Sequence, residues 1–186
     1  MRSRDLVFYS DKTVLERMAS ALHVNEYIVA KHFSSEKELQ LLREKMRGDS
    51  VQFKFCHVLE RENAQELKRF QKKADFVGVM GKDVGRNKFA VQHKADFLFM
   101  PCSFEKPEMD AGIARIAAEN DITIAILFSD FLKAGALQRS MGFKNYQLVN
   151  LLCKKFGTKI EVFSGAKKES ELRSPRDLKN LMALLE

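Results

Sequence analysis

The chain has 186 residues, 45% of them hydrophobic and 31% charged, so it can bury a substantial core and lacks the composition of a disordered or fibrous protein. Its net charge of +7, most of it in residues 61–186, favours a polyanionic partner such as nucleic acid, although a basic protein without such a partner has the same composition. Three scattered cysteines without a CxxC pattern, no signal peptide and no apolar run near the ~20 residues of a membrane span predict a reduced, cytoplasmic protein.

Short apolar runs alternate with segments of helical periodicity along the chain. The predicted strands are residues 6–9, 27–30, 51–59, 75–80, 96–100, 122–128 and 160–163. The predicted helices are residues 11–22, 35–47, 63–73, 86–94, 109–119, a long helix within 130–156, and 175–185. Ser34 or Ser35 can cap the second helix with Glu38 in a capping box, and Asn63 can cap the third. Gly157 is expected to end the long helix in the left-handed conformation.

Seven alternations of strand and helix predict a parallel α/β sheet with right-handed crossovers. The run ITIAILF (122–128) is almost entirely apolar, as expected for a strand covered on both faces. Two architectures fit this pattern: an open doubly wound sheet, and a TIM-like (β/α) barrel of about seven parallel strands ringed by helices. Even spacing favours the barrel, with residues 1–186 as a single domain. In both architectures, ligands bind at the carboxyl ends of the strands.

The histidines do not form a recognisable metal-binding pattern. No two of them stand at metal-ligand spacing, so we expect no metal site; they are His23, His32, His57 and His93. His57 lies within an apolar strand and is interpreted as a hydrogen-bonded core residue. We therefore expect no metal-dependent hydrolysis.

The sequence also lacks a pattern for nucleophilic catalysis. It contains no GxSxG motif, and no cysteine stands visibly with a histidine. Asp96, Asp110 and Asp130 adjoin strand ends or helix starts, and they are interpreted as helix caps or as charges that complement helix dipoles. We expect no catalytic residue and no cofactor within the chain.

Positive charge gathers beside two predicted strand-to-helix turns. The turn GKDVGR (81–86) lacks a phosphate-binding glycine motif, and its two glycines are interpreted as positive-φ residues that carry Lys82 and Arg86 outward. After the last strand, the small residues 164–166 would allow something to approach the backbone amides closely. Lys167 and Lys168 follow directly.

Residues 173–177 combine a helix start with two arginines. Ser174, Pro175 and Asp177 have the pattern of a capped first turn. Arg173 and Arg176 oppose the helix dipole there, so an anion should offset them. Asp177 can do so for Arg173 within the chain, and a phosphate can do so for both arginines.

Four stretches resemble the archaeal ribonuclease P protein component 3 family, which is homologous to a eukaryotic RNase P/MRP subunit. They are SGA and LRSPRDL within 164–178, GIARIAAENDITIAILFSDFL (112–132), GKDVGRNKFAVQHKADFLFMP (81–101), and the segment from Gly135 and Arg139 through the long helix to Lys155. Together they cover residues 75–186, while the N-terminal third matches the family only in its alternation of predicted strands and helices. The sequence departs from the family at Met100-Pro101, often His-Pro, and at Met80-Gly81, usually Gly-Gly. These departures count against the related polymerase-and-histidinol-phosphatase hydrolases, which need such histidines for metal.

The resemblance implies a seven-stranded, ten-helix TIM-like barrel with no active site of its own. It implies a subunit of the ribonucleoprotein that removes the 5′ leader of precursor tRNA, with the catalytic groups in the RNase P RNA and its Mg²⁺ ions. The expected partners are that RNA, protein component 2 in a heterodimer or heterotetramer, other protein subunits and, indirectly, precursor tRNA, with no membrane. The chain would support the catalytic domain of the RNA.

Cationic side chains around the strand-end loops are expected to neutralise RNA phosphates. They are Arg173, Arg176, Lys167 and Lys168 from the last loop, Lys82, Arg86 and Lys88 from the fourth, and Arg139. Ser174 and Asp177 are expected to act as a helix cap or salt-bridge partner. Two other functions stay open: a TIM-like enzyme that binds a phosphorylated small molecule at the 164–176 loop, and a general RNA-binding protein.

Overall fold

The seven strands form one parallel sheet that curls into a barrel. A computed structural model describes residues 3–48 and 50–186. The strands are β1 (Arg4–Val7), β2 (Glu26–Lys31), β3 (Gln52–Leu59), β4 (Phe76–Met80), β5 (Phe97–Phe99), β6 (Thr123–Leu127) and β7 (Lys159–Phe163). Each strand pairs in parallel with the next along the chain, in the order β1 to β7. A doubly wound sheet reverses its strand order at a switch point, so the observed order confirms the predicted barrel.

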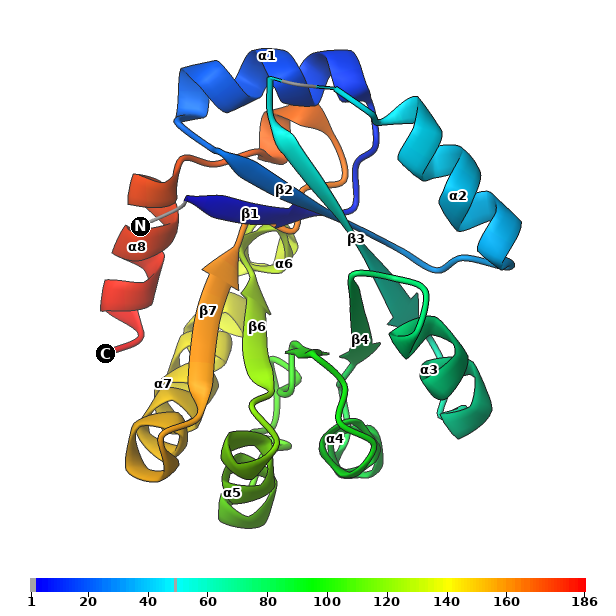
Figure 1. The fold of residues 1–186 in the computed structure, drawn as a ribbon. Helices are drawn as coiled ribbons and strands as arrows, with labels where there is room; N and C mark the ends of the chain where they lie inside the picture. The colour runs from blue at the N-terminus through cyan, green and yellow to red at the C-terminus, as the bar shows by residue number, and fades with distance from the viewer. Residues whose placement is uncertain (1–2, 49) are drawn as a thin grey trace.

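Helices surround the strands as an outer ring (Figure 1). They are α1 (Lys12–Leu22), α2 (Glu36–Lys45), α3 (Ala64–Gln71), α4 (Val84–Gln92), α5 (Ala111–Glu119), α6 (Phe128–Lys133), α7 (Ala136–Phe156), α8 (Pro175–Leu184) and a short 3₁₀ helix, η1 (Glu169–Glu171). The described residues thus hold fewer helices than the ten that the resemblance implied. Among these helices, none combines the length and the apolar character that crossing a membrane requires.

The helix ends follow the predicted caps with two corrections. Ser35 Oγ accepts from the backbone N of Glu38, and Asn63 caps α3 as predicted. The Glu38 carboxylate accepts from Ser34 and not from the backbone N of Ser35, so the predicted capping box does not form. The long helix expected within 130–156 is instead two helices, because Ala134 leaves the helical conformation at ψ 138° and Gly135 starts α7. Gly157 ends α7 at φ 75°, which confirms its left-handed role.

Aromatic rings fill the interior of the barrel. The rings of Phe97 and Phe99 lie 5.8 Å apart, and Phe163 meets Phe97 edge-on at 5.9 Å. Gly78 on β4 makes room for this layer, since a Cβ there would lie 2.2 Å from the Phe99 ring. All five residues of β6 are buried, as the apolar run predicted.

The barrel closes between β1 and β7 through single contacts in place of a continuous ladder. Beyond the end of β7, the backbone N of Gly165 donates to Leu6 O at 2.9 Å. The backbone N of Phe8 donates to Ala166 O at 2.8 Å. At the other end of β1, Arg4 pairs with Glu161 at 2.5 Å. The segment 164–166 therefore takes the place of an eighth strand.

Asp5 lies at the centre of this junction and was assigned no role from the sequence. Its side chain is buried, and Oδ1 and Oδ2 accept from the backbone N and the Oγ of Ser164 at 2.7 and 2.6 Å. Burial raises the pKa of Asp5 to about 7, and the hydrogen bonds from Ser164 oppose this shift. A carboxyl group that favours its protonated form thus joins the first strand to the last.

Candidate functional site

The carboxyl ends of the strands surround a small cup at the mouth of the barrel. The cup has a volume of about 220 Å³ and is lined by Phe8, His32, Val58, Glu60, Met80, Leu127, Asp130 and Lys167. These residues lie at or just beyond the ends of β1, β2, β3, β4, β6 and β7. The cup therefore occupies the end of the barrel at which ligands of such folds bind.

Lysines surround the carboxylate of Asp130 at this mouth. The positive charges of Lys167, Lys133 and Lys82 lower the pKa of Asp130, while its burial raises that pKa more strongly. Lys167 Nζ lies 5.8 Å from the centre of the Phe8 ring, and Lys133 pairs with Glu171 at 3.3 Å. Two predicted cations, Lys167 and Lys82, thus both act on Asp130, and so does Lys133, which the sequence did not single out.

The small residues 164–166 do let partners approach their backbone amides closely, as predicted, and those partners belong to the protein itself. Their amides donate to Asp5, to Leu6 and to Ser164 Oγ. Gly165 has φ 59°, and a Cβ there would lie 2.9 Å from Leu127 Cβ. Glycine is needed at this position because β6 packs closely against the closing segment.

The start of α8 is capped as predicted, but Arg173 does not pair with Asp177. Ser174 Oγ accepts from the backbone N of Asp177, and the Asp177 carboxylate accepts in return from the backbone N and Oγ of Ser174. Arg173 instead donates to the backbone oxygens of Ser170 and Leu172 and lies 5.2 Å above the Phe128 ring. Arg173 therefore holds the preceding loop in place.

Two cations of the last loop extend into solvent. Lys168 and Arg176 are exposed, and their side chains form no hydrogen bond or ion pair with the described residues. Unlike Arg173, their side chains hold no other part of the protein in place, so they are the stronger candidates for phosphate contacts among the predicted residues. That role stays a prediction.

The turn at 81–86 differs from its interpretation. Lys82 itself has a positive φ of 99°, whereas neither glycine of the turn does. A Cβ on Gly81 would lie within 2.9 Å of the backbone oxygens of Met100 and Phe99, so this glycine permits a close approach. Asp83 caps α4, which begins two residues before its predicted start, and pairs with Arg86 at 3.6 Å.

The remaining predicted cations lie on helices away from the cup. Arg139 donates to the backbone oxygens of Phe131 and Ala134, both at 3.0 Å, and so closes the carboxyl end of α6. Lys88 is exposed on α4. Neither position excludes RNA contacts, which stay predictions for both residues.

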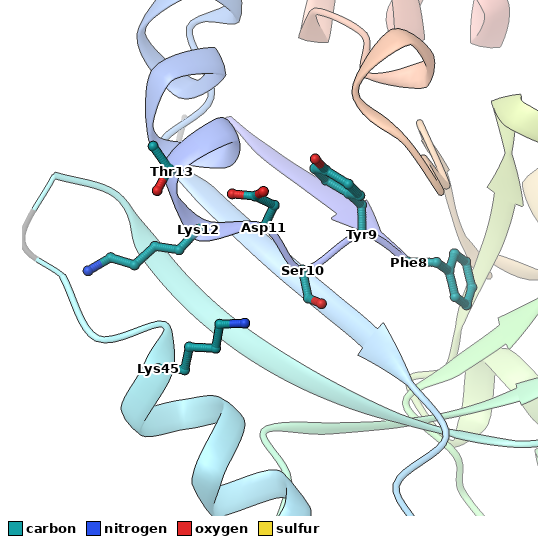
Figure 2. Close-up of a pocket in the computed structure, with 7 residues that line it drawn as sticks. All are labelled: Phe8, Tyr9, Ser10, Asp11, Lys12, Thr13 and Lys45. Carbon is teal, nitrogen blue, oxygen red and sulfur yellow. The ribbon is translucent and has the colours of Figure 1, made fainter.

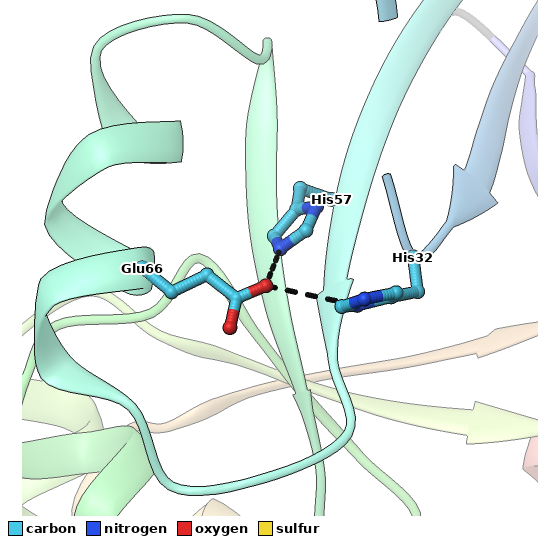
Figure 3. Close-up of side chains that lie close together, drawn as sticks. All are labelled: His32, His57 and Glu66. Carbon is cyan, nitrogen blue, oxygen red and sulfur yellow. Dashed lines mark hydrogen bonds and ion pairs between the residues drawn. The ribbon is translucent and has the colours of Figure 1, made fainter. Parts of the chain in front are cut away.

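A cluster of His32, His57 and Glu66 was missed from the sequence (Figure 3). Glu66 Oε1 lies 3.0 Å from His57 Nε2 and 3.7 Å from His32 Nδ1. His32 and His57 stand 25 positions apart along the chain, so their spacing does not reveal the cluster. The pairing of β2 with β3, which sets Lys31 beside His57, brings the histidines together.

The hydrogen bonds of this cluster do not suit a metal ion. Phe33 N–H donates to His57 Nδ1 at 3.2 Å, so the proton of the neutral ring is on Nε2 and points to Glu66. His32 Nδ1 lies 3.2 Å from Val58 O, an acceptor, so this nitrogen carries a proton too. A metal on His57 Nε2 would force a proton onto Nδ1, where the Phe33 N–H already lies.

His57 is a structural residue, as interpreted from its apolar strand. It is buried and stacks on the Phe70 ring with a centroid distance of 3.6 Å. Burial lowers the pKa of His57 to about 4, and the hydrogen bond to Glu66 opposes this shift.

We expect His57→Phe to destabilise the fold by about 2 kcal/mol, because it keeps the ring stack and leaves the Phe33 N–H and Glu66 without their partner. Urea unfolding would measure the loss. The matched change His32→Phe, at a side chain 41% exposed, should cost less than about 0.5 kcal/mol. Added zinc should not change the urea midpoint of the wild type or of either variant. If zinc stabilised the wild type and neither variant, His57 and His32 would be metal ligands, which would contradict the structural role.

A larger hollow lies beside the loop between β1 and α1 (Figure 2). It measures about 640 Å³ and is lined by residues 8–13 and Lys45. Two of its polar side chains have partners within the protein: Asp11 caps α1, and Lys12 donates to Arg47 O and pairs with Glu16. This hollow lies beside the first strand only, whereas the cup lies where several strands end.

The outer face of α7 carries an exposed apolar stripe. The residues of this α7 stripe follow a 4-3 repeat: Leu137, Met141, Lys144, Leu148, Leu151 and Lys155. Leu137 and Leu151 are 75% and 60% exposed, whereas Tyr146, Val149 and Cys153 on the opposite face are buried against the barrel. A 4-3 repeat is the pattern by which one helix packs along another.

Comparisons with known proteins agree with the resemblance. A sequence profile described as "RNase P subunit p30" matches residues 56–186. "Ribonuclease P protein component 3" of Methanothermobacter thermautotrophicus is 27% identical over 123 residues, 65% of this chain and 50% of the relative. The protein of the same name from Archaeoglobus fulgidus is 25% identical over 129 residues, 67% of this chain and 63% of the relative. The chain thus spans about half to two thirds of the length of these relatives.

A solved structure shares the fold. A chain in the "cryo-EM structure of archaeal Ribonuclease P with mature tRNA" matches with a TM-score of 0.82 over 98% of this chain and 82% of that chain, at 18% identity. The profile match extends over more than half of the sequence, from β3 to the end of α8. The chain therefore belongs to the RNase P subunit p30 family.

Proposed function

We propose that this chain is a protein subunit of ribonuclease P, which removes the 5′ leader of precursor tRNA. In this proposal, the catalytic groups and Mg²⁺ belong to the RNase P RNA. The chain binds the catalytic domain of that RNA together with protein component 2 and stabilises its active shape. The single observation that carries the proposal is family membership over residues 56–186, which include every predicted RNA-binding cation.

The charges at the mouth support an RNA partner. Lys82, Lys168 and Arg176 are exposed and form no ion pair with the described residues, so an incoming phosphate need not displace an internal partner. Each cation that neutralises a phosphate releases counterions, which strengthens binding at low salt without reading sequence. Such contacts let a folded RNA hold its shape at a lower Mg²⁺ concentration.

The α7 stripe supports a protein partner. Four exposed apolar side chains in one 4-3 repeat form a surface that a partner helix can cover. Lys144 and Lys155 interrupt the repeat and favour a partner with carboxylates opposite them. In this proposal, component 2 supplies that helix.

Reconstitution tests the function. The chain, component 2 and the RNase P RNA of the same organism should together cleave precursor tRNA faster at limiting Mg²⁺ than the mixture without the chain. The double variant Lys168→Ala/Arg176→Ala should lower the dependence of log Kd on log salt by about 1.4 to 1.8, the value for two phosphates.

The matched control is Lys68→Ala/Lys72→Ala, at two exposed lysines of α3 and its carboxyl end. This control should leave the salt dependence unchanged. If the chain adds nothing to cleavage, the proposed function is wrong, and binding without cleavage would favour a general RNA-binding protein. Equal slopes for the two double variants would remove Lys168 and Arg176 from the RNA interface.

A further inference from the structure

The cup at the mouth combines features that phosphate binding alone does not need. Its walls include the side chains of Phe8, Val58, Met80 and Leu127, which are apolar. The Phe8 ring packs edge-on against Phe99 at 6.1 Å and is held in place from below. His32, Glu60, Asp130 and Lys167 complete the lining, and the volume of about 220 Å³ has room for one flat ring system and is smaller than the pockets that bind drug-sized molecules.

Asp130 is the one aspartate in the described residues whose carboxylate forms neither a hydrogen bond nor an ion pair within 4 Å. The others each accept from a backbone or side-chain donor, as Asp110 does from the backbone N of Ile113 at 2.8 Å. Asp130 lies in the first turn of α6, where it complements the helix dipole as predicted, but it does not cap this helix, which has no side-chain cap hydrogen bond. A half-buried carboxylate that lines a cup can accept from a donor that enters it.

The cations around the cup restrict what that donor can be. Lys167 lines the cup, and the charges of Lys133 and Lys82 also act on Asp130, so together these lysines oppose the binding of a free amine or polyamine. Inorganic phosphate would suit these lysines and would be repelled by Asp130. The ligand must therefore carry N–H donors on a flat apolar body, with an anionic group beside it.

We infer that the cup binds one nucleotide with an amino-bearing base. The base enters between the apolar walls and donates its amino N–H groups to Asp130, while its phosphate lies against Lys82 and Lys167. Single-stranded RNA is commonly recognised by such splayed bases, and a carboxylate accepts well from the N4 amino group of cytosine. This inference rests on the proposed function for an RNA source, and a free nucleotide shares the same chemistry.

The test compares fluorescent oligo(C) and oligo(U) of about eight nucleotides. Uracil is the matched probe because it has a carbonyl oxygen where cytosine has the amino group. The wild-type chain should bind oligo(C) about 10-fold more tightly, as expected for a hydrogen bond to a charged acceptor. Asp130→Asn should bring the ratio close to 1 and leave the salt dependence unchanged. Met80→Trp, which fills the cup without altering charge, should do the same.

Lys168→Ala is the control, because it should weaken both oligonucleotides equally and keep their ratio. CMP and UMP identify the source: CMP that binds as tightly as oligo(C), and only with Asp130 present, assigns the cup to a free nucleotide. An unchanged oligo(C) to oligo(U) ratio in Asp130→Asn and Met80→Trp would overturn the inference while the RNA-binding proposal stands. Absence of RNA binding, nucleotide binding and any gain in cleavage would overturn both.

Discussion

Asp5→Asn should make the protein more stable than the wild type at pH 8, by as much as about 4 kcal/mol before any loss from changed hydrogen bonds to Ser164 is subtracted. The pKa of Asp5 is about 7 in the folded protein and near 3.8 in an unfolded chain. The folded state therefore binds this proton more tightly, so the contribution of Asp5 to stability is complete below pH 4 and is lost as the pH rises through 7. Asparagine stays neutral and avoids that loss.

At pH 4 the variant and the wild type should differ by less than about 1 kcal/mol, because the protonated carboxyl of Asp5 and the asparagine amide each offer Ser164 one oxygen acceptor and one donor. Urea unfolding across pH 4 to 8 would give the free energy of unfolding of the variant and of the wild type at each pH. The difference between the two removes the contribution of all other titrating groups, which both proteins share. Ser164→Ala is the control, since it weakens the junction but keeps the titrating carboxyl. A difference between Asp5→Asn and wild type that does not vary with pH would contradict the raised pKa.

His57 should produce the opposite trend within the same window. Its pKa of about 4 lies below the usual 6.5, so its contribution to stability is lost as the pH falls from 6.5 to 4. In the wild type, the effects of Asp5 and His57 oppose one another over this range. Removal of Asp5 therefore exposes the acid sensitivity that His57 causes.

Leu151→Glu should weaken the association of this chain with component 2 by about 100-fold, because it places a charge at the centre of an apolar contact. Leu151 is 60% exposed, so the fold should keep its stability, as a thermal scan can verify. Titration calorimetry with purified component 2 would measure the affinity. RNA binding by the isolated chain should keep its salt dependence, which separates the two surfaces.

The matched control is Leu41→Glu on α2, at a leucine 66% exposed and outside the α7 stripe. It should leave the affinity for component 2 unchanged. Lys144→Glu should weaken the association most at low salt, if carboxylates of component 2 lie opposite. Equal losses for Leu41→Glu and Leu151→Glu would show that component 2 does not bind the α7 stripe.

Local features of the sequence predicted the elements well, while features that depend on strand order were missed. The periodicity of the helices and the caps Ser35 and Asn63 depend on residues a few positions apart, so the sequence displays them. The choice between a barrel and a doubly wound sheet depends on which strands are neighbours, and the sequence left both open. The pairs of Asp5 with Ser164 and of His32 with His57 likewise span distant positions.

The candidate site was predicted at the correct end of the barrel but with partly wrong roles. Lys82 and Lys167 both act on Asp130 because parallel strands present their carboxyl ends at the same end of the barrel. Arg173 was expected to pair with Asp177 or a phosphate; it donates to backbone oxygens of its own loop and does not pair with Asp177, while its phosphate contact stays a prediction. Residue type reveals a charge, but only the folded loop shows which acceptors lie within reach.

The closing of β1 by residues 164–166 constrains the order of folding during synthesis. Until these residues leave the ribosome, one edge of β1 in the nascent chain stays unpaired, because its hydrogen-bond partners have not yet been exposed. Contacts this distant along the chain are slow to form, and an open strand edge favours pairing with another chain. A chaperone that shields this edge should therefore raise the yield of native protein.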